Sequence, residues 1–125
     1  MKNEKRIYVV VPKKVIVPGK KLRMVCGRLM AQVAHVVSKL KLRLKLDPDK
    51  EYTTIVLQVK NNEELLRMYV RFLDTYSKIY HLPCEIFWDT NFDFYGTGTP
   101  YATAFAAMLT KEHAEFFAGF KLYKC

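Results

Sequence analysis

A run of five residues, Ile7 to Val11 (IYVVV), places the strongest constraint on how this chain can fold. Every position is apolar or aromatic, so a strand built from the run has two hydrophobic faces, and both must be covered. Such strands are typical of sheets that carry helices on both sides. The run ends at Pro12. We expect the next segment, PKKVIVPGKK (12–21), to be a basic loop because two prolines and a glycine interrupt it.

The rest of the chain alternates between helical and strand-like patterns. Helical spacing of apolar residues begins near Gly27 and continues to at least residue 42, although KLKLRLKL (39–46) also alternates with a period of two. Asp47-Pro48-Asp49 is the expected stop of this helix. The remaining pattern predicts strands at 52–59, 84–88 and 101–109 and helices at 61–80 and 111–118.

Capping residues support the two later helices. Asn61 with Glu64 three residues on is a helix start, and Thr110 can cap the last helix, which Gly119 ends. We therefore expect one α/β domain over residues 1–125 in the order β-α-β-α-β-β-α. Its predicted core is a four-stranded mixed sheet with helices packed on its faces, and its first strands run parallel through helical crossovers.

Charge is distributed unevenly along the chain, whose net charge is +9. Residues 1–46 hold 13 Lys and Arg side chains against one acid, whereas residues 47–125 hold more acids than bases. A concentration of cations is typical of proteins that bind polyanions, and nucleic acid is the leading candidate partner. A basic surface that serves only solubility is the simpler alternative.

The three cysteines, Cys26, Cys84 and Cys125, are odd in number and widely scattered. They predict reduced thiols in a cytoplasmic protein rather than a disulfide framework. Neither they nor the three histidines show the close spacing of zinc ligands, so we expect no metal and no cofactor. No apolar stretch approaches the roughly 18 residues of a membrane span, so we expect no membrane association of that kind.

The first expected helix carries polar residues in an otherwise apolar segment, CGRLMAQVAHVV (26–37). They form a polar stripe on one helix face, because each is three or four residues from the next. The stripe consists of Arg28, Gln32, His35 and Lys39. Arg28 falls in the first turn, where the helix dipole favours an anion and disfavours a cation, so an anionic partner would explain it. The stripe is either a solvated surface or the wall of a site.

Asp89 follows the expected strand 84–88 and begins a turn-rich segment, DTNFDFYGTGTP (89–100), which contains a second acid, Asp93. Sites in α/β proteins lie at the carboxyl ends of strands. A carboxylate there can orient a water molecule or accept its proton. An ordinary turn-forming aspartate is the alternative.

Residues 22–37, LRMVCGRLMAQVAHVV, resemble the signature of the archaeal and eukaryotic type of peptidyl-tRNA hydrolase. In that signature Leu-Lys-Met leads into Gly-Lys, and Ala-Gln is followed, after one residue, by Ala-His-Ala. Segments 55–69, 88–99 and 110–124 resemble, in order, the family's second strand and helix, its aspartate loop ending in Gly-Thr, and its final helix and tail. The resemblance covers nearly the whole chain.

The resemblance implies an enzyme that hydrolyses the ester between a peptide and the 3′ ribose of tRNA, so that tRNA is recycled. Asp89 would orient or deprotonate the water, Arg28 would offset the oxyanion or a 3′-terminal phosphate, and Thr99 would hydrogen-bond Asp89 or the water. The segment 12–21 resembles a short insertion. The implied tRNA-binding residues are Lys20, Lys21, Arg23, Gln32, His35 and Lys39, with Lys13, Lys14, Lys41 and Arg43 as further backbone contacts. A homodimer is also implied.

Two departures from the family pattern motivate an alternative to the active hydrolase. Arg28 stands where the family has lysine, and the exchange keeps the charge but not the point-charge character of an ammonium group. Asp93 stands where the family has threonine and would place a second carboxylate near Asp89. The alternative is a hydrolase-like domain that has lost catalysis and serves as an RNA-binding or interaction module.

Overall fold

The computed structural model of this chain describes four stretches, residues 5–24, 26–47, 49–89 and 98–124. The apolar run lies within a longer strand, β1 (Lys5–Val17), in the interior of a mixed sheet. Its side chains alternate between two cores: Tyr8 and Val10 face one, and Ile7 and Val9 face the other. All four are buried. The expectation that both faces of this run are covered is confirmed.

The sheet has six strands, ordered β4-β5-β1-β3-β6 with β2 paired to β1. The strands besides β1 are β2 (Lys20–Arg23), β3 (Thr54–Asn61), β4 (Cys84–Asp89), β5 (Tyr101–Thr110) and β6 (Lys121–Leu122). β1 and β3 are parallel, as predicted, and β5 runs antiparallel to both β1 and β4. The expectation of four strands is wrong because β2 and β6 are short and lack the apolar alternation by which strands are recognised.

The expected basic loop at 12–21 is also wrong, since this segment extends β1 and returns as β2 in a hairpin. Pro12 falls between the part of β1 that pairs with β5, which ends at Val10, and the part that pairs with β2, which begins at Lys14. A proline is tolerated in such a gap of the ladder. The second proline precedes Gly19, whose φ of 77° is the left-handed conformation that a Pro-Gly turn requires.

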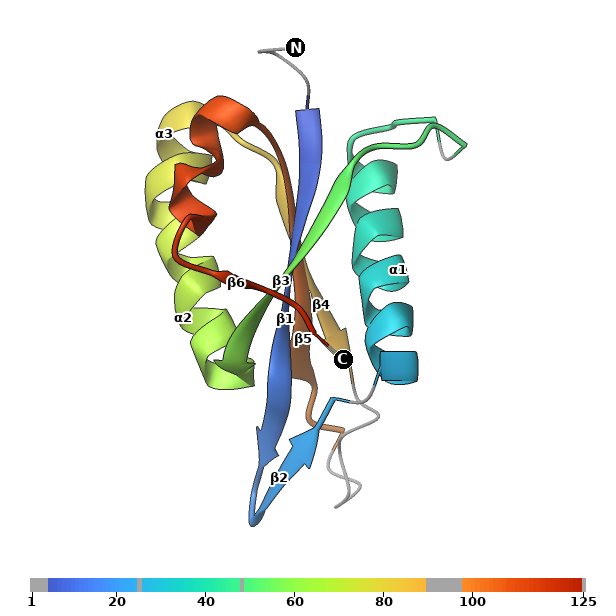
Figure 1. Cartoon of the computed structure of the whole chain (residues 1–125), viewed down its shortest axis with the longest axis vertical. Coiled ribbons are helices and arrows are strands. Elements are labelled where there is room, and N and C mark those ends of the chain that lie inside the picture. The colour runs from blue at the N-terminus through green and yellow to red at the C-terminus, as the bar shows by residue number, and fades with distance from the viewer. Residues whose placement is uncertain (1–4, 25, 48, 90–97, 125) are drawn as a thin grey trace.

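Helices cover both faces of the sheet (Figure 1). One face carries α1 (Cys26–Arg43), and the other carries α2 (Asn62–Phe72), α3 (Lys78–Tyr80) and a 3-10 helix (Lys111–Phe117). The ambiguous stretch at 39–46 is helical as far as Arg43. A π-helical turn (Leu73–Ser77) joins α2 to α3, so helical structure reaches residue 80 as predicted. Within the described stretches, no helix is long and apolar enough to cross a bilayer.

The last helix differs from the expectation in its type. A 3-10 helix places residues three apart on one side, and Ala114, Phe117 and Phe120 have that spacing. Phe117 is buried in the core beneath α2 and stacks on Tyr8 with ring centroids 5.3 Å apart, and Ala114 and Phe120, which follows the helix, pack against this core. The three-residue spacing of these side chains matches the geometry of a 3-10 helix. The Thr110 side chain makes no capping hydrogen bond within the described part of the chain.

The predicted cap of α2 is present: the Asn61 side-chain oxygen accepts a hydrogen bond from the Glu64 backbone N–H at 2.9 Å. Asn61→Ala is expected to lower the free energy of unfolding by about 1 kcal/mol, because one N–H of the first turn loses its acceptor. Asn61→Asp keeps an acceptor and is expected to cost less than about 0.5 kcal/mol. Urea unfolding of the two variants measures the difference, and equal losses would show that the cap contributes nothing.

Candidate active site

The strand ends bring the candidate residues to one edge of the sheet. β4 and β1 both run antiparallel to β5, so β4 is parallel to β1 and β3, and these three strands end at the same edge. Asp89 is the last residue of β4 and pairs with Tyr101, the first residue of β5. Helix α1 begins at this edge (Figure 1). Asp89 therefore has the position that the sequence predicted.

A chain of buried side chains joins α1 to this edge. The Gln32 amide nitrogen donates to Asp89 Oδ2 at 2.6 Å, and the Thr103 hydroxyl donates to Gln32 Oε1 at 2.5 Å. Gln32 is 3 % exposed, Asp89 5 % and Thr103 0 %. The three residues come from α1, β4 and β5, so the chain links the helix to the sheet through polar contacts.

The two partners of Gln32 determine how its amide is oriented. A carboxylate only accepts hydrogen bonds, so the NH2 group must face Asp89. The oxygen of the same amide is then available to the Thr103 hydroxyl. Buried polar groups with such partners avoid the cost of lost hydration. The arrangement holds the Asp89 carboxylate in one orientation at the end of β4.

Two further predicted catalytic residues are close in sequence to residues of this hydrogen-bonded site. Arg28 is exposed in the first turn of α1, four residues before Gln32 and therefore on the same helix face. Thr99 is exposed and lies two residues before Tyr101, the register partner of Asp89. Asp93 lies outside the described residues.

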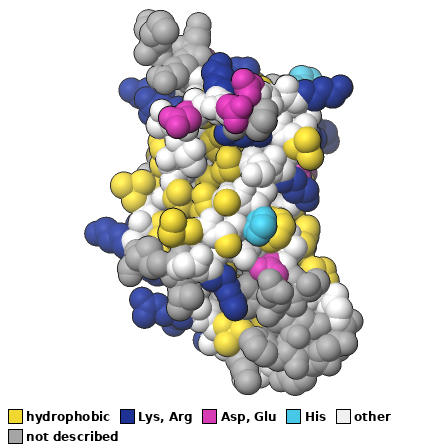
Figure 2. All heavy atoms as spheres, turned by 90° about the vertical axis from the view of Figure 1, so that its right-hand side faces the viewer, with side chains coloured by type: hydrophobic (Ala, Val, Ile, Leu, Met, Phe, Trp, Pro, Cys, Tyr) yellow, Lys and Arg dark blue, Asp and Glu magenta, His cyan; other side chains and the backbone are white. Residues whose placement is uncertain are grey.

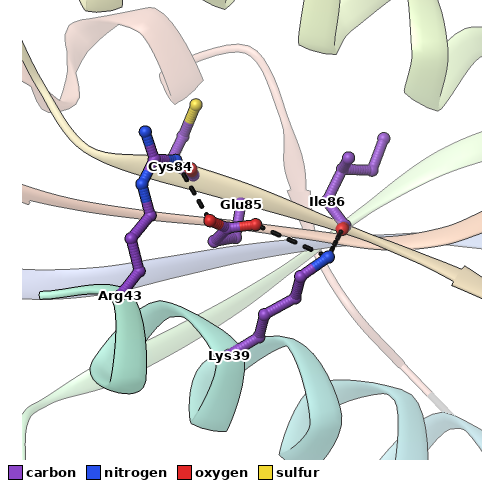
Figure 3. Close-up of polar contacts among 5 residues, drawn as sticks. All are labelled: Lys39, Arg43, Cys84, Glu85 and Ile86. Atoms are coloured by element: carbon purple, nitrogen blue, oxygen red, sulfur yellow. Dashed lines mark hydrogen bonds and ion pairs between the residues drawn. The ribbon is translucent and has the colours of Figure 1, made fainter.

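The rest of the polar stripe contacts β4, although His35 and Lys39 are both exposed. The His35 ring stacks on Phe87 with centroids 5.0 Å apart and planes 15° apart. Lys39 Nζ donates to the Ile86 carbonyl at 3.1 Å and lies 3.6 Å from a Glu85 carboxylate oxygen (Figure 3). Together with the Gln32–Asp89 bond, these contacts show that three members of the stripe face β4.

Arg43 extends this pattern by one more helical turn. Its guanidinium donates to the Cys84 carbonyl at 2.5 Å and to Glu85 at 3.1 Å (Figure 3). β4 is an edge strand, and Lys39 and Arg43 occupy carbonyl groups that an edge leaves open. These two cations, predicted as tRNA contacts, are thus engaged by the fold, although their side chains remain 49 % and 58 % exposed.

The predicted tRNA contacts nearer the N-terminus lie in the β1–β2 hairpin. Lys20, Lys21 and Arg23 follow the turn of the hairpin, which extends β1 beyond its pairing with β5. Lys21 and Arg23 are exposed. The hairpin projects from the end of the sheet at which β4 ends with Asp89 (Figure 1). The structure therefore separates the predicted cations into a group on α1 beside β4 and a group on the hairpin.

The described cysteine offers no nucleophile. Cys84 is 3 % exposed, and burial raises the pKa of its thiol to about 11. The thiol is therefore protonated at neutral pH and unreactive. Within the described stretches, no group of three or more His, Cys, Asp or Glu side chains is arranged to hold a metal ion.

An open groove of about 560 Å³ lies on the opposite side of α1 from Gln32. Its lining is mainly apolar and includes Met30, Val33, Val37 and Tyr123. Figure 2, which views the molecule from the side that carries α1, shows hydrophobic side chains gathered on this face. None of the described residues that line the groove carries a carboxylate, imidazole or amine. The described lining therefore offers no carboxylate or imidazole base for hydrolysis.

Sequence reasoning did not identify Thr103 or Phe87 as part of this region. Thr103 is a hydroxyl residue inside the otherwise apolar strand sequence YATAFAAML, and a buried hydroxyl needs a partner. That requirement was the available signal for Thr103. No comparable signal marks Phe87 as the partner of His35. Comparison of the sequence with protein-family models and with curated proteins found no match.

Replacing Gln32 tests the buried chain. Gln32→Met leaves both Asp89 and Thr103 without this partner and is expected to lower the free energy of unfolding by about 2–4 kcal/mol. Gln58→Met is the matched control, since Gln58 is only partly buried, and a change of less than about 0.5 kcal/mol is expected. Urea unfolding measures both variants, and similar losses would contradict a special role of Gln32.

Proposed function

We propose that this chain hydrolyses the ester bond of peptidyl-tRNA, with Asp89 as the residue that orients and deprotonates the attacking water. The observation that supports the proposal is the 2.6 Å hydrogen bond between Gln32 and Asp89. Gln32 belongs to the segment that resembles the hydrolase signature, and Asp89 belongs to the segment that resembles the aspartate loop. These two segments are distant in the sequence and meet through buried polar side chains.

The chemistry of the step follows from the groups at this edge. The water oxygen bonds to the ester carbonyl carbon while its proton passes to the Asp89 carboxylate. The bond from that carbon to the ribose oxygen then breaks, and the proton goes to the leaving 3′-oxygen. The products are a peptide with a free carboxylate and a tRNA with a 3′-hydroxyl. Gln32 keeps the carboxylate in place during both proton transfers.

Arg28 supplies the positive charge in this proposal. It lies one helical turn from Gln32 on the same face, in the first turn of a helix whose dipole also favours negative charge. The developing oxyanion or a 3′-terminal phosphate is the anion it would offset. Thr99, near the start of β5, would hydrogen-bond the water or Asp89.

Asp89→Asn provides the first test. The variant keeps the shape of the side chain and an acceptor oxygen for Gln32 but removes the base, so turnover of N-acetyl-aminoacyl-tRNA is expected to fall at least about 100-fold. Asp74→Asn removes one carboxylate from an exposed position in the π-helical turn and is expected to leave turnover unchanged. Release of deacylated tRNA is the readout.

The same experiment separates the enzyme from the RNA-binding module. Binding of tRNA without turnover by the unmodified chain would favour the module. Turnover that Asp89→Asn leaves intact would contradict the role of Asp89.

Arg28 variants test the second role. Arg28→Ala is expected to lower kcat about 100-fold, because a cation that stabilises the transition state is lost. Arg28→Lys keeps the charge and is expected to retain most of the activity. Arg67→Ala, at an exposed position of α2, is the matched control and should have no effect on kcat. An effect of Arg28→Ala on KM alone would instead assign Arg28 to substrate binding.

A further inference from the structure

Three cations of the β1–β2 hairpin share one of its faces. Directly opposed residues of an antiparallel pair lie on one face, and the register pairs Lys14 with Arg23 and Ile16 with Lys21. Lys14, Lys21 and Arg23 are exposed, and we call this surface the cation face. On the opposite face, Val15 is fully buried in the core beneath α1.

The cation face places like charges together. Lys14 and Arg23 are direct cross-strand partners, an arrangement that destabilises an antiparallel pair. Within the described stretches, no acid forms an ion pair with Lys14, Lys21 or Arg23. Lys13, by contrast, donates to the Lys124 carbonyl at 2.8 Å and lies over the Tyr123 ring. An external anion would therefore relieve the repulsion on the cation face.

A buried side chain holds the hairpin in position. Asn62, at the start of α2, accepts a hydrogen bond from the Ile16 N–H at 2.6 Å and donates to the Ile16 carbonyl at 3.3 Å. Asn62 is 6 % exposed. Its amide thus replaces a neighbouring strand at a point where β3 has ended, since β3 pairs with β1 only as far as Lys14. The cation face is consequently fixed relative to the sheet before any ligand binds.

The composition of the hairpin indicates which part of a nucleic acid it fits. Residues 12–23, PKKVIVPGKKLR, contain no aromatic side chain. Single-stranded RNA is commonly bound by stacking of bases on aromatic rings, which this segment cannot supply. Lysine and arginine side chains instead contact the phosphates of a duplex without reading its sequence.

We propose that the cation face binds phosphates of double-stranded RNA, namely the acceptor stem of the tRNA substrate; the identity of the RNA rests on the proposed function. The cation face lies on the side of β1 that carries Tyr8 and Val10, whereas Asp89 contacts Gln32 on the α1 side. β4 ends with Asp89 at the same end of the sheet from which the hairpin projects. The single-stranded 3′ end of the tRNA then runs from the stem, past the sheet edge, to Asp89.

The test measures binding of uncharged tRNA and of a short RNA duplex between about 50 and 200 mM salt. The triple variant Lys14→Gln, Lys21→Gln, Arg23→Gln is expected to reduce the slope of log affinity against log salt by about 2–3. Its affinity at low salt should fall at least about tenfold. The matched control is Lys5→Gln, Lys78→Gln, Lys111→Gln, which removes the same charge from exposed positions at the other end of the molecule and should change affinity less than about twofold.

Several outcomes would overturn the proposal. Equal losses in the two triple variants would show that only net charge matters. A larger loss of affinity for single-stranded RNA than for the duplex would contradict duplex binding. If the variant lost affinity only for vesicles of anionic lipid and bound RNA as before, the cation face would instead be a membrane-binding surface. The melting temperature of the hairpin variant should not fall, because like-charge repulsion is removed.

Hydrolysis distinguishes this proposal from the function on which it rests. With N-acetyl-aminoacyl-tRNA, the hairpin variant is expected to raise KM and leave kcat unchanged. Hydrolysis with an unaltered KM would refute the hairpin proposal and leave the esterase intact. If the chain showed no turnover but bound the duplex through the hairpin, the esterase proposal would be refuted. The hairpin would then remain an RNA-binding surface.

Discussion

Burial of both faces of β1 is the constraint on which the rest of this structure depends. Its alternating side chains enter two separate cores, so one helix layer is required on each side. α1 covers one core and α2, with the 3-10 helix, covers the other. A consequence is that α1 and β5 lie close enough for Gln32 and Thr103 to bond. Hydrophobic burial therefore places the hydrogen-bonded side chains of Gln32 and Thr103 within reach of each other.

Helix α1 has three faces, and each has different surroundings. Leu29, Val36 and Leu40 are buried in the core, and the polar stripe follows β4. The remaining side is the apolar groove. Because Gln32, His35 and Lys39 all contact β4, the stripe protects an edge strand and at the same time orients the Asp89 carboxylate. A residue on this stripe can thus serve packing and the candidate site together.

Most elements could be predicted from periodicity, and the failures have identifiable causes. The helix from residue 26, the parallel pairing of β1 with β3 and the Asn61 cap all agree with the sequence pattern. The hairpin was predicted as a loop because prolines are strong signals for irregular structure. Pro12 is nevertheless tolerated, since the ladder on one side of β1 is interrupted where it lies. Such a gap is a property of neighbouring strands and cannot be seen in a local segment.

The sequence by itself determined the two-sided burial of the first strand, the uneven charge and the placement of Asp89 at a strand end. These follow from local composition and from the periods of strand and helix. Only the tertiary structure decided that Gln32 bonds Asp89 and that Lys14 stands opposite Arg23. Contacts between residues distant in sequence depend on strand register and helix rotation. Those quantities are set by packing of the whole domain, because a shift of one residue moves a side chain to the other face.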